Sequence, residues 1–134
     1  MILSFSVFRE KIESGEKRQT IRKFSPRQWK IAQNAKKYQL YWHNPRNGGT
    51  LIKEVERSKE PELIQFCQYD SFVGKDNRFK RVINTVIDAN TGDAIPMFKL
   101  AKDDGFENDF DMWDWFYQEY CEQMFQEKFI VYRW

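Results

Sequence analysis

Two residue types on which many active sites depend are scarce in this chain of 134 residues. It has one histidine, His43, and two cysteines, Cys67 and Cys121, which lie 54 positions apart. Zinc and redox motifs place their cysteines close together, so we interpret both as reduced packing residues. A histidine-rich metal site is excluded, and a Ser-His-Asp triad would depend on His43 alone. The sequence therefore predicts a protein with no metal and no other cofactor.

The chain also lacks a long hydrophobic run. No stretch approaches the roughly 18 consecutive apolar residues that a membrane helix needs. The opening segment MILSFSVFREK is apolar, but no basic segment precedes it and no small-residue cleavage site follows, which is unlike a secretory signal. We therefore expect a soluble, cytoplasmic protein without membrane contact. The length is typical of one domain, spanning residues 1–134.

The net charge of +2 is small, but the charges are unevenly distributed. Residues 1–60 hold 14 Lys or Arg against 6 Asp or Glu, whereas residues 103–134 hold 2 against 9. A basic region of this kind suits a phosphate-bearing partner. The alternative is that the two segments neutralise each other in the fold. The sequence leaves both interpretations open.

Short β-prone segments bounded by turn signals dominate the secondary-structure pattern. A first helix, capped by Ser6 and stopped by Gly15, and a second helix beginning near Asp109 are expected. In the second helix, spacings of three and four residues predict an apolar face formed by Phe110, Trp113, Tyr117, Tyr120, Cys121 and Met124. A polar helix or loop follows Pro26. Segments with strand composition are 2–6, 20–24, 37–42, 50–56, 63–69, 81–89, 94–100 and 128–134.

This pattern predicts a mainly β, α+β fold, in which about six or seven short strands form a small β-barrel decorated by helices. We expect the last strand to complete the barrel by covering an exposed edge.

The octet GEKRQTIR, residues 15–22, is either a solvated turn after a helix or the floor of a binding site. Lys17, Arg18, Arg22 and the adjacent Lys23 crowd together, and a polyanion lying over them would relieve their repulsion. Residues three apart on a regular strand face opposite sides. Lys17 and Thr20 can therefore share a site only if the chain bends at residues 16–18.

Two blocks of the sequence resemble a known family. The segment ILSFSVFREKIESGEKRQTIR resembles the signature of the ASCH domain, a relative of the PUA domain, in which a strand and a short helix lead to Gly-x-Lys-x-x-Thr-Ile-Arg. The segment FKLAKDDGF, followed by an aromatic helix and a last strand, is similar to a second family block. The resemblance implies a PUA-like barrel with a cleft and a link to RNA. Some relatives are RNA-binding modules, a small stand-alone branch hydrolyses the acetyl amide of N4-acetylcytidine, and another stand-alone member is a ribonuclease.

The resemblance also implies site residues. The family lysine and threonine fall on Lys17 and Thr20, and the family glutamate falls on Asp104, with Asp103 as a near competitor. Lys17 could act as a base, Thr20 as the nucleophile or as the group that orients a water, and Asp104 as the group that holds the lysine or moves the proton. An aspartate reaches one methylene less than a glutamate, which puts hydrolysis in doubt but not binding.

We therefore expect a basic cleft that binds RNA or a modified nucleoside. The first alternative is a hydrolase, either an N4-acetylcytidine amidohydrolase or a ribonuclease. The second is a protein-interaction module that uses the acidic, aromatic C-terminal segment, with Trp115 and Trp134 exposed. The oligomeric state stays open between a monomer and a weak dimer. The expected binding residues are Lys17, Arg18, Thr20, Arg22, Lys23 and Arg46.

Overall fold

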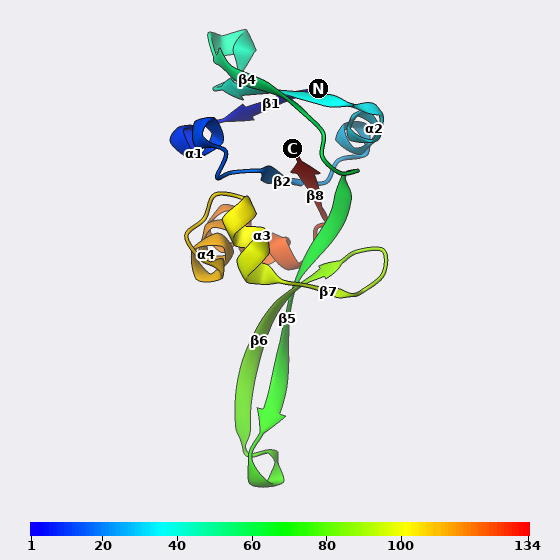
Figure 1. Cartoon of the computed structure of the whole chain (residues 1–134). Helices are drawn as coiled ribbons and strands as arrows, with labels where there is room; N and C mark the ends of the chain where they lie inside the picture. Colours follow the sequence, from blue (N-terminus) through cyan, green and yellow to red (C-terminus); the bar gives the residue numbers. More distant parts are fainter.

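A computed structural model describes all 134 residues as an α+β fold with strands in two sheets (Figure 1). The strands are β1 (Ile2–Phe5), β2 (Gln19–Lys23), β3 (Lys37–Trp42), β4 (Thr50–Glu56), β5 (Glu62–Val73), β6 (Phe79–Asp88), β7 (Ala94–Ile95) and β8 (Phe129–Arg133). The α-helices are α1 (Arg9–Ser14), α2 (Pro26–Asn34), α3 (Met97–Asp103) and α4 (Asp109–Tyr120). Short 3-10 helices are η1 (Pro45–Asn47), η2 (Lys75–Asn77) and η3 (Cys121–Phe125). The α+β class is confirmed.

The two sheets have three and five strands. The smaller has the order β1-β3-β4, with β1 parallel to β3, and the larger has the order β2-β8-β5-β6-β7, with all pairs antiparallel. Neither sheet closes on itself, so the predicted closed barrel is not confirmed. The last strand, β8, does not cover an outer edge either, because it lies inside the larger sheet between β2 and β5.

Strand β8 separates two hydrophobic cores. Phe129 and Val131 pack into the core that α3 and α4 cover, while Ile130 and Tyr132 pack into the core beneath the smaller sheet. Successive strand residues point to opposite faces, so a strand that is buried on both faces needs a continuous apolar run. The segment Phe129–Tyr132 supplies such a run, and all four side chains are buried.

Three local predictions were wrong. The N-cap of α1 is Phe8 rather than Ser6, and Phe8 adopts a left-handed φ of 64° with no side-chain cap. Of residues 94–100 only Ala94–Ile95 form a strand, because Pro96 has no amide hydrogen to donate to a sheet and instead precedes α3. In α4 the buried residues are Met112, Trp113 and Phe116, whereas Phe110 and Tyr117 are exposed.

The β5–β6 pair extends away from the rest of the molecule as a long hairpin (Figure 1). Both strands are longer than the predicted segments 63–69 and 81–89, because strand pairing continues to Val73 and Phe79. Several large apolar side chains on this hairpin are exposed: Tyr69, Phe72, Val73, Phe79 and Val82. None of the helices has the length and apolar character that crossing a membrane requires.

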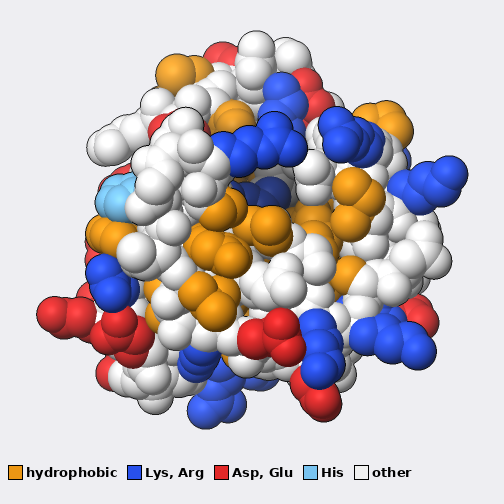
Figure 2. All heavy atoms as spheres, turned by 90° about the horizontal axis from the view of Figure 1, so that it is seen from above, with side chains coloured by type: hydrophobic (Ala, Val, Ile, Leu, Met, Phe, Trp, Pro, Cys, Tyr) orange, Lys and Arg blue, Asp and Glu red, His pale blue; other side chains and the backbone are white.

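Ion pairs join the basic and acidic segments of the chain. Residues of the basic segment pair with the acidic one in Lys11–Glu107, Lys17–Asp104 and Lys23–Glu127. Part of the uneven charge distribution is therefore neutralised within the fold, as the second interpretation predicted. On the face seen from above in Figure 2, hydrophobic side chains gather in the middle, and both basic and acidic side chains lie around them.

Candidate functional site

The bend predicted within the octet is confirmed. Gly15 ends α1 with a left-handed φ of 84°, residues 16–18 are irregular, and β2 begins at Gln19. This path places Lys17 and Thr20 on the lining of one pocket, where their exposed fractions are 2% and 4%. Glycine is suited to the position because it adopts positive φ without steric cost.

The pocket has a volume of about 270 Å³ and lies between β1, β2, the end of α3 and α4. Its lining combines aromatic side chains with charged and hydroxyl groups. The aromatic members are Phe5, Phe8, Trp115, Phe116 and Tyr120, and the charged and hydroxyl members include Lys17, Thr20, Arg22, Asp104 and Glu119. Four of the residues that the sequence indicated, Lys17, Thr20, Arg22 and Asp104, are thus brought together.

Lys17 and Asp104 form a buried ion pair across the pocket. The Nζ of Lys17 lies 3.4 Å from Oδ2 of Asp104 and also donates a hydrogen bond to the main-chain carbonyl of Asp104. The second carboxylate oxygen, Oδ1, is buried and has no partner in the protein. The competing Asp103 faces elsewhere and pairs with Lys99 at 2.8 Å. The geometry therefore favours Asp104 over Asp103.

Burial moves both members of this pair toward their neutral forms. It lowers the pKa of Lys17, and the attraction of Asp104 opposes that shift only in part. It raises the pKa of Asp104, with Lys17 again opposing. The Nζ of Lys17 also lies 5.3 Å from the ring centre of Phe8 and 5.7 Å from that of Phe5, which favour its cationic form. Burial of Lys17 and the two rings beside it therefore shift its proton affinity in opposite directions.

Arg22 orients the hydroxyl group of Thr20. The two side chains lie on the same face of β2 because they are two residues apart. The Nε of Arg22 donates to Oγ1 of Thr20 at 3.2 Å, and its Nη2 donates to the carbonyl of Ser4 at 2.6 Å. Since Oγ1 accepts from Arg22, the hydroxyl hydrogen of Thr20 is free to be donated to another group.

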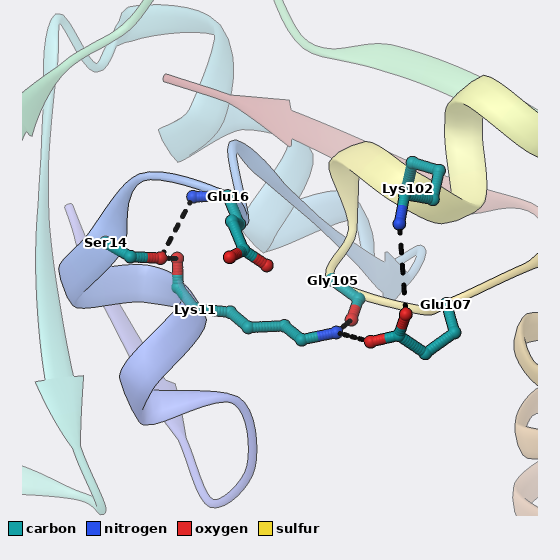
Figure 3. Close-up of polar contacts among 6 residues, drawn as sticks. All are labelled: Lys11, Ser14, Glu16, Lys102, Gly105 and Glu107. Atoms are coloured by element: carbon teal, nitrogen blue, oxygen red, sulfur yellow. Dashed lines mark hydrogen bonds and ion pairs between the residues drawn. The ribbon is translucent and has the colours of Figure 1, made fainter.

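A clamp of polar contacts fixes the two segments that carry Lys17 and Asp104. In Figure 3, the side chain of Lys11 reaches from α1 to the connection between α3 and α4. Its Nζ donates to the carbonyl of Gly105 and to Oε1 of Glu107, both at 2.6 Å. Lys102 lies 4.0 Å from the same carboxylate. The clamp therefore holds helix α1 against the turn after α3.

Sequence reasoning missed several residues in and around the site, and three of them bear on its chemistry. Gln19 is fully buried, its Nε2 donates to the carbonyl of Leu100 at 3.0 Å, and its Oε1 has no partner. Glu119 contributes a carboxylate to the pocket. Trp115 was assigned to an exposed surface, and it is 39% exposed but also lines the pocket. Only the position of Trp115 off the apolar face of α4 could have indicated a role.

The other predicted binding residues lie outside this pocket. Arg18 lines different cavities, Lys23 is exposed 3.5 Å from Glu127, and Arg46 is an exposed residue of η1. His43 lies against Trp42, with the ring centres 4.6 Å apart. No three His, Cys, Asp or Glu residues are grouped so that they could hold a metal ion.

Comparisons with protein-family models, with curated proteins and with solved structures found no match for this chain. The resemblance to the ASCH family therefore stays a prediction from the sequence.

Proposed function

We propose that this chain is an ASCH-type, PUA-like protein whose pocket binds a nucleobase, carried by a modified nucleoside or by RNA in the cytoplasm. One observation carries the proposal: aromatic side chains and buried polar groups converge on one small pocket. Its volume of about 270 Å³ lies at the lower end for ligand pockets, which suits a single base. Aromatic faces such as those of Phe8 and Trp115 are the surfaces on which unpaired RNA bases stack.

The polar groups of the pocket match the edge of a base. A cytosine offers ring acceptors beside an exocyclic amino donor. Lys17 and Arg22 are donors, Glu119 is an acceptor, and Asp104 presents an oxygen that no protein group satisfies. A buried polar atom without a partner costs about 1 to 3 kcal/mol, so a ligand that supplied the missing partner would be favoured.

The binding test uses N4-acetylcytidine and cytidine as probes in isothermal titration calorimetry. We expect Asp104→Asn and Lys17→Met to weaken binding at least tenfold, because each removes a hydrogen bond to a charged group, worth about 1.5 to 3 kcal/mol. Lys75→Ala, at the far end of the β5–β6 hairpin, is the matched control and should bind as the parent does. The proposal would be contradicted if the parent and the three variants bound with equal affinity, or if the parent bound neither probe.

Amide hydrolysis is a second candidate, and the 3.4 Å contact between Lys17 and Asp104 favours it. In this scheme neutral Lys17 takes a proton from Thr20 or from a water, whose oxygen attacks the acetyl carbon. The carbon–nitrogen bond then breaks, and Asp104, which starts protonated when Lys17 is neutral, gives its proton to the departing amine, so that the pair ends as ammonium and carboxylate. When water attacks, the products are acetate and cytidine. When Thr20 attacks, cytidine leaves first, and one water then releases acetate from the acyl-enzyme.

Acetate release from N4-acetylcytidine tests this second function. Lys17→Met should abolish turnover. If the hydroxyl group of residue 20 is needed, Thr20→Ser should retain turnover, because it keeps the hydroxyl, and Thr20→Val should lose turnover. Binding without acetate release in the parent protein would reject hydrolysis and leave the binding proposal intact. Incubation with a labelled RNA in the same buffers tests the ribonuclease alternative, for which shortened products are required.

A protein-interaction role for the C-terminal segment has weaker support. Trp115 contributes to the pocket wall, and Trp134 is partly buried with its ring 6.1 Å from that of Phe5. Trp115 is 39% exposed, as the interaction hypothesis expected, whereas Trp134 is not exposed.

A further inference from the structure

Two further cavities, which share Arg18 and Asp103, form what we call the basic groove. Their volumes are about 410 and 320 Å³. Together they are lined by six cationic side chains against two carboxylates, and by an apolar floor that includes Leu100 and Trp134. The cations are Lys11, Arg18, Lys59, Lys99, Lys102 and Arg133, and the acids are Glu16 and Asp103.

Two of these six cations are not neutralised by the protein. Lys11 and Lys102 share the carboxylate of Glu107. Lys99 pairs with Asp103 at 2.8 Å, and Arg133 pairs with Glu62 at 2.9 Å. Arg18 and Lys59, in contrast, have no carboxylate within ion-pair distance. A concave surface with this excess of positive charge attracts anions, and the attraction is strongest for a polyanion.

Two buried polar atoms beside the groove also lack partners. Gln19 and Trp134 line the larger cavity, and neither Oε1 of Gln19 nor Nε1 of Trp134 has a hydrogen-bond partner. Gln19 is fully buried, so its unsatisfied oxygen is not simply exposed to bulk water. The glutamine oxygen needs a donor and the indole nitrogen needs an acceptor. A ribonucleotide carries both kinds of group, in its hydroxyls and its phosphate oxygens.

The groove adjoins the pocket through two pairs of neighbouring residues. Lys17 lines the pocket and Arg18 the groove, and Asp104 lines the pocket and Asp103 the groove. Gly105 continues the second segment along the smaller cavity of the groove. We infer that the basic groove holds the phosphates of a single-stranded RNA whose base enters the pocket. This inference rests on the proposed function and narrows its ligand from a free nucleoside to an RNA strand.

The experiment measures binding of a fluorescein-labelled eight-nucleotide RNA that contains N4-acetylcytidine, by anisotropy between 50 and 200 mM salt. Arg18→Ala and Lys59→Ala should each weaken binding and lower the slope of log affinity against log salt by about 0.7, the value for one phosphate contact on a single strand. Asp103→Asn should strengthen binding, because it removes a negative charge from the groove. Lys75→Ala, on the distant hairpin, should leave affinity and slope unchanged.

The outcomes separate this inference from the function on which it rests. If the free nucleoside binds but the three groove variants bind RNA with the affinity of the parent, the groove inference is overturned and the pocket proposal stands. If RNA binding depends on the groove but neither nucleoside binds, the pocket proposal fails and the groove is supported. If inorganic phosphate binds the groove as tightly as the RNA does, the groove is a site for a single anion and the inference is overturned.

Discussion

Separating the buried pair of Lys17 and Asp104 should destabilise the fold strongly. Their side chains are 2% and 8% exposed, so solvent cannot replace a lost partner. Removing one member of such a pair costs about 3 to 5 kcal/mol, because the other charge stays buried without compensation. Lys17 can release its proton, since burial already lowers its pKa. We therefore expect Asp104→Leu and Lys17→Met each to lower the free energy of unfolding by about 3 kcal/mol, the lower end of that range.

Replacing both residues should cost far less than the sum of the single changes. The double variant Lys17→Met/Asp104→Leu buries two apolar side chains beside Phe5 and Phe8, and such replacements are often neutral or stabilising. The expected coupling energy is about 3 kcal/mol or more. A domain of this size is stable by roughly 5 to 15 kcal/mol, so the single variants should remain folded.

Urea unfolding at pH 7, followed by circular dichroism and tryptophan fluorescence, measures the cycle. The neighbouring pair Lys99 and Asp103 is the matched control, because Lys99 is 76% exposed and an exposed pair contributes up to about 1 kcal/mol. Additive single and double effects at Lys17 and Asp104 would refute the reasoning. A loss below about 1 kcal/mol for Asp104→Leu would do so as well.

Three further predictions concern stability and the clamp. Burial raises the pKa of Tyr132 to about 12, so the folded protein favours the neutral phenol. Its contribution to the free energy of unfolding should be complete below pH 10 and should fall by up to about 2.7 kcal/mol as the pH rises to 12. The difference in stability between the parent and Tyr132→Phe measures this contribution. Gly15→Ala should lower the free energy of unfolding in urea by about 1 to 2 kcal/mol, because the φ of 84° is strained for alanine. No atom lies within 4 Å of the added carbon, so this backbone strain is the whole cost. Gly15→Asn should cost less, because asparagine tolerates positive φ better. Lys11→Ala should lower nucleoside affinity severalfold in calorimetry, whereas Arg9→Ala on the same helix should not.

Sequence patterns predicted local structure well where one physical effect dominated. The run Phe129–Tyr132 and the alternating residues of β3 have strand composition, and both form strands. The bend after Gly15 followed from the need to bring Lys17 and Thr20 together. The predicted apolar face of α4 was wrong at Phe110, which is exposed. This helix has aromatic residues on several sides, so the sequence pattern does not determine which side packs against the core.

The site was predictable only on the segment that carries the octet. Lys17 and Thr20 are close in sequence, but their partner Asp104 is more than 80 residues away, and the resemblance alone pointed to it. Gln19 and Glu119 were not predictable. Whether a glutamine at the start of a strand is buried depends on the helix that packs over it, and here the carbonyl that fixes its amide belongs to Leu100.

The aspartate at position 104, where the ASCH pattern has a glutamate, can be explained by the backbone around it. Gly105 has a φ of 101°, and a Cβ atom there would lie 3.2 Å from Cγ of Phe8 and 3.4 Å from Cδ of Lys17. The glycine therefore lets the main chain approach Lys17 closely enough for the carbonyl and the carboxylate of Asp104 to reach the same Nζ.

A longer side chain should then be a poor substitute at this position. Asp104→Glu adds a methylene where only 5% of the residue is exposed, and overpacking of this kind typically costs about 1 to 3 kcal/mol. We expect Asp104→Glu to be less stable than the parent in urea unfolding and to bind nucleoside more weakly. Asp103→Glu, at the more exposed neighbouring position, should change neither property. If Asp104→Glu were as stable as the parent and bound nucleoside equally well or better, the pocket would have room for a glutamate. The close approach of the backbone at Gly105 would then not explain why an aspartate stands at position 104.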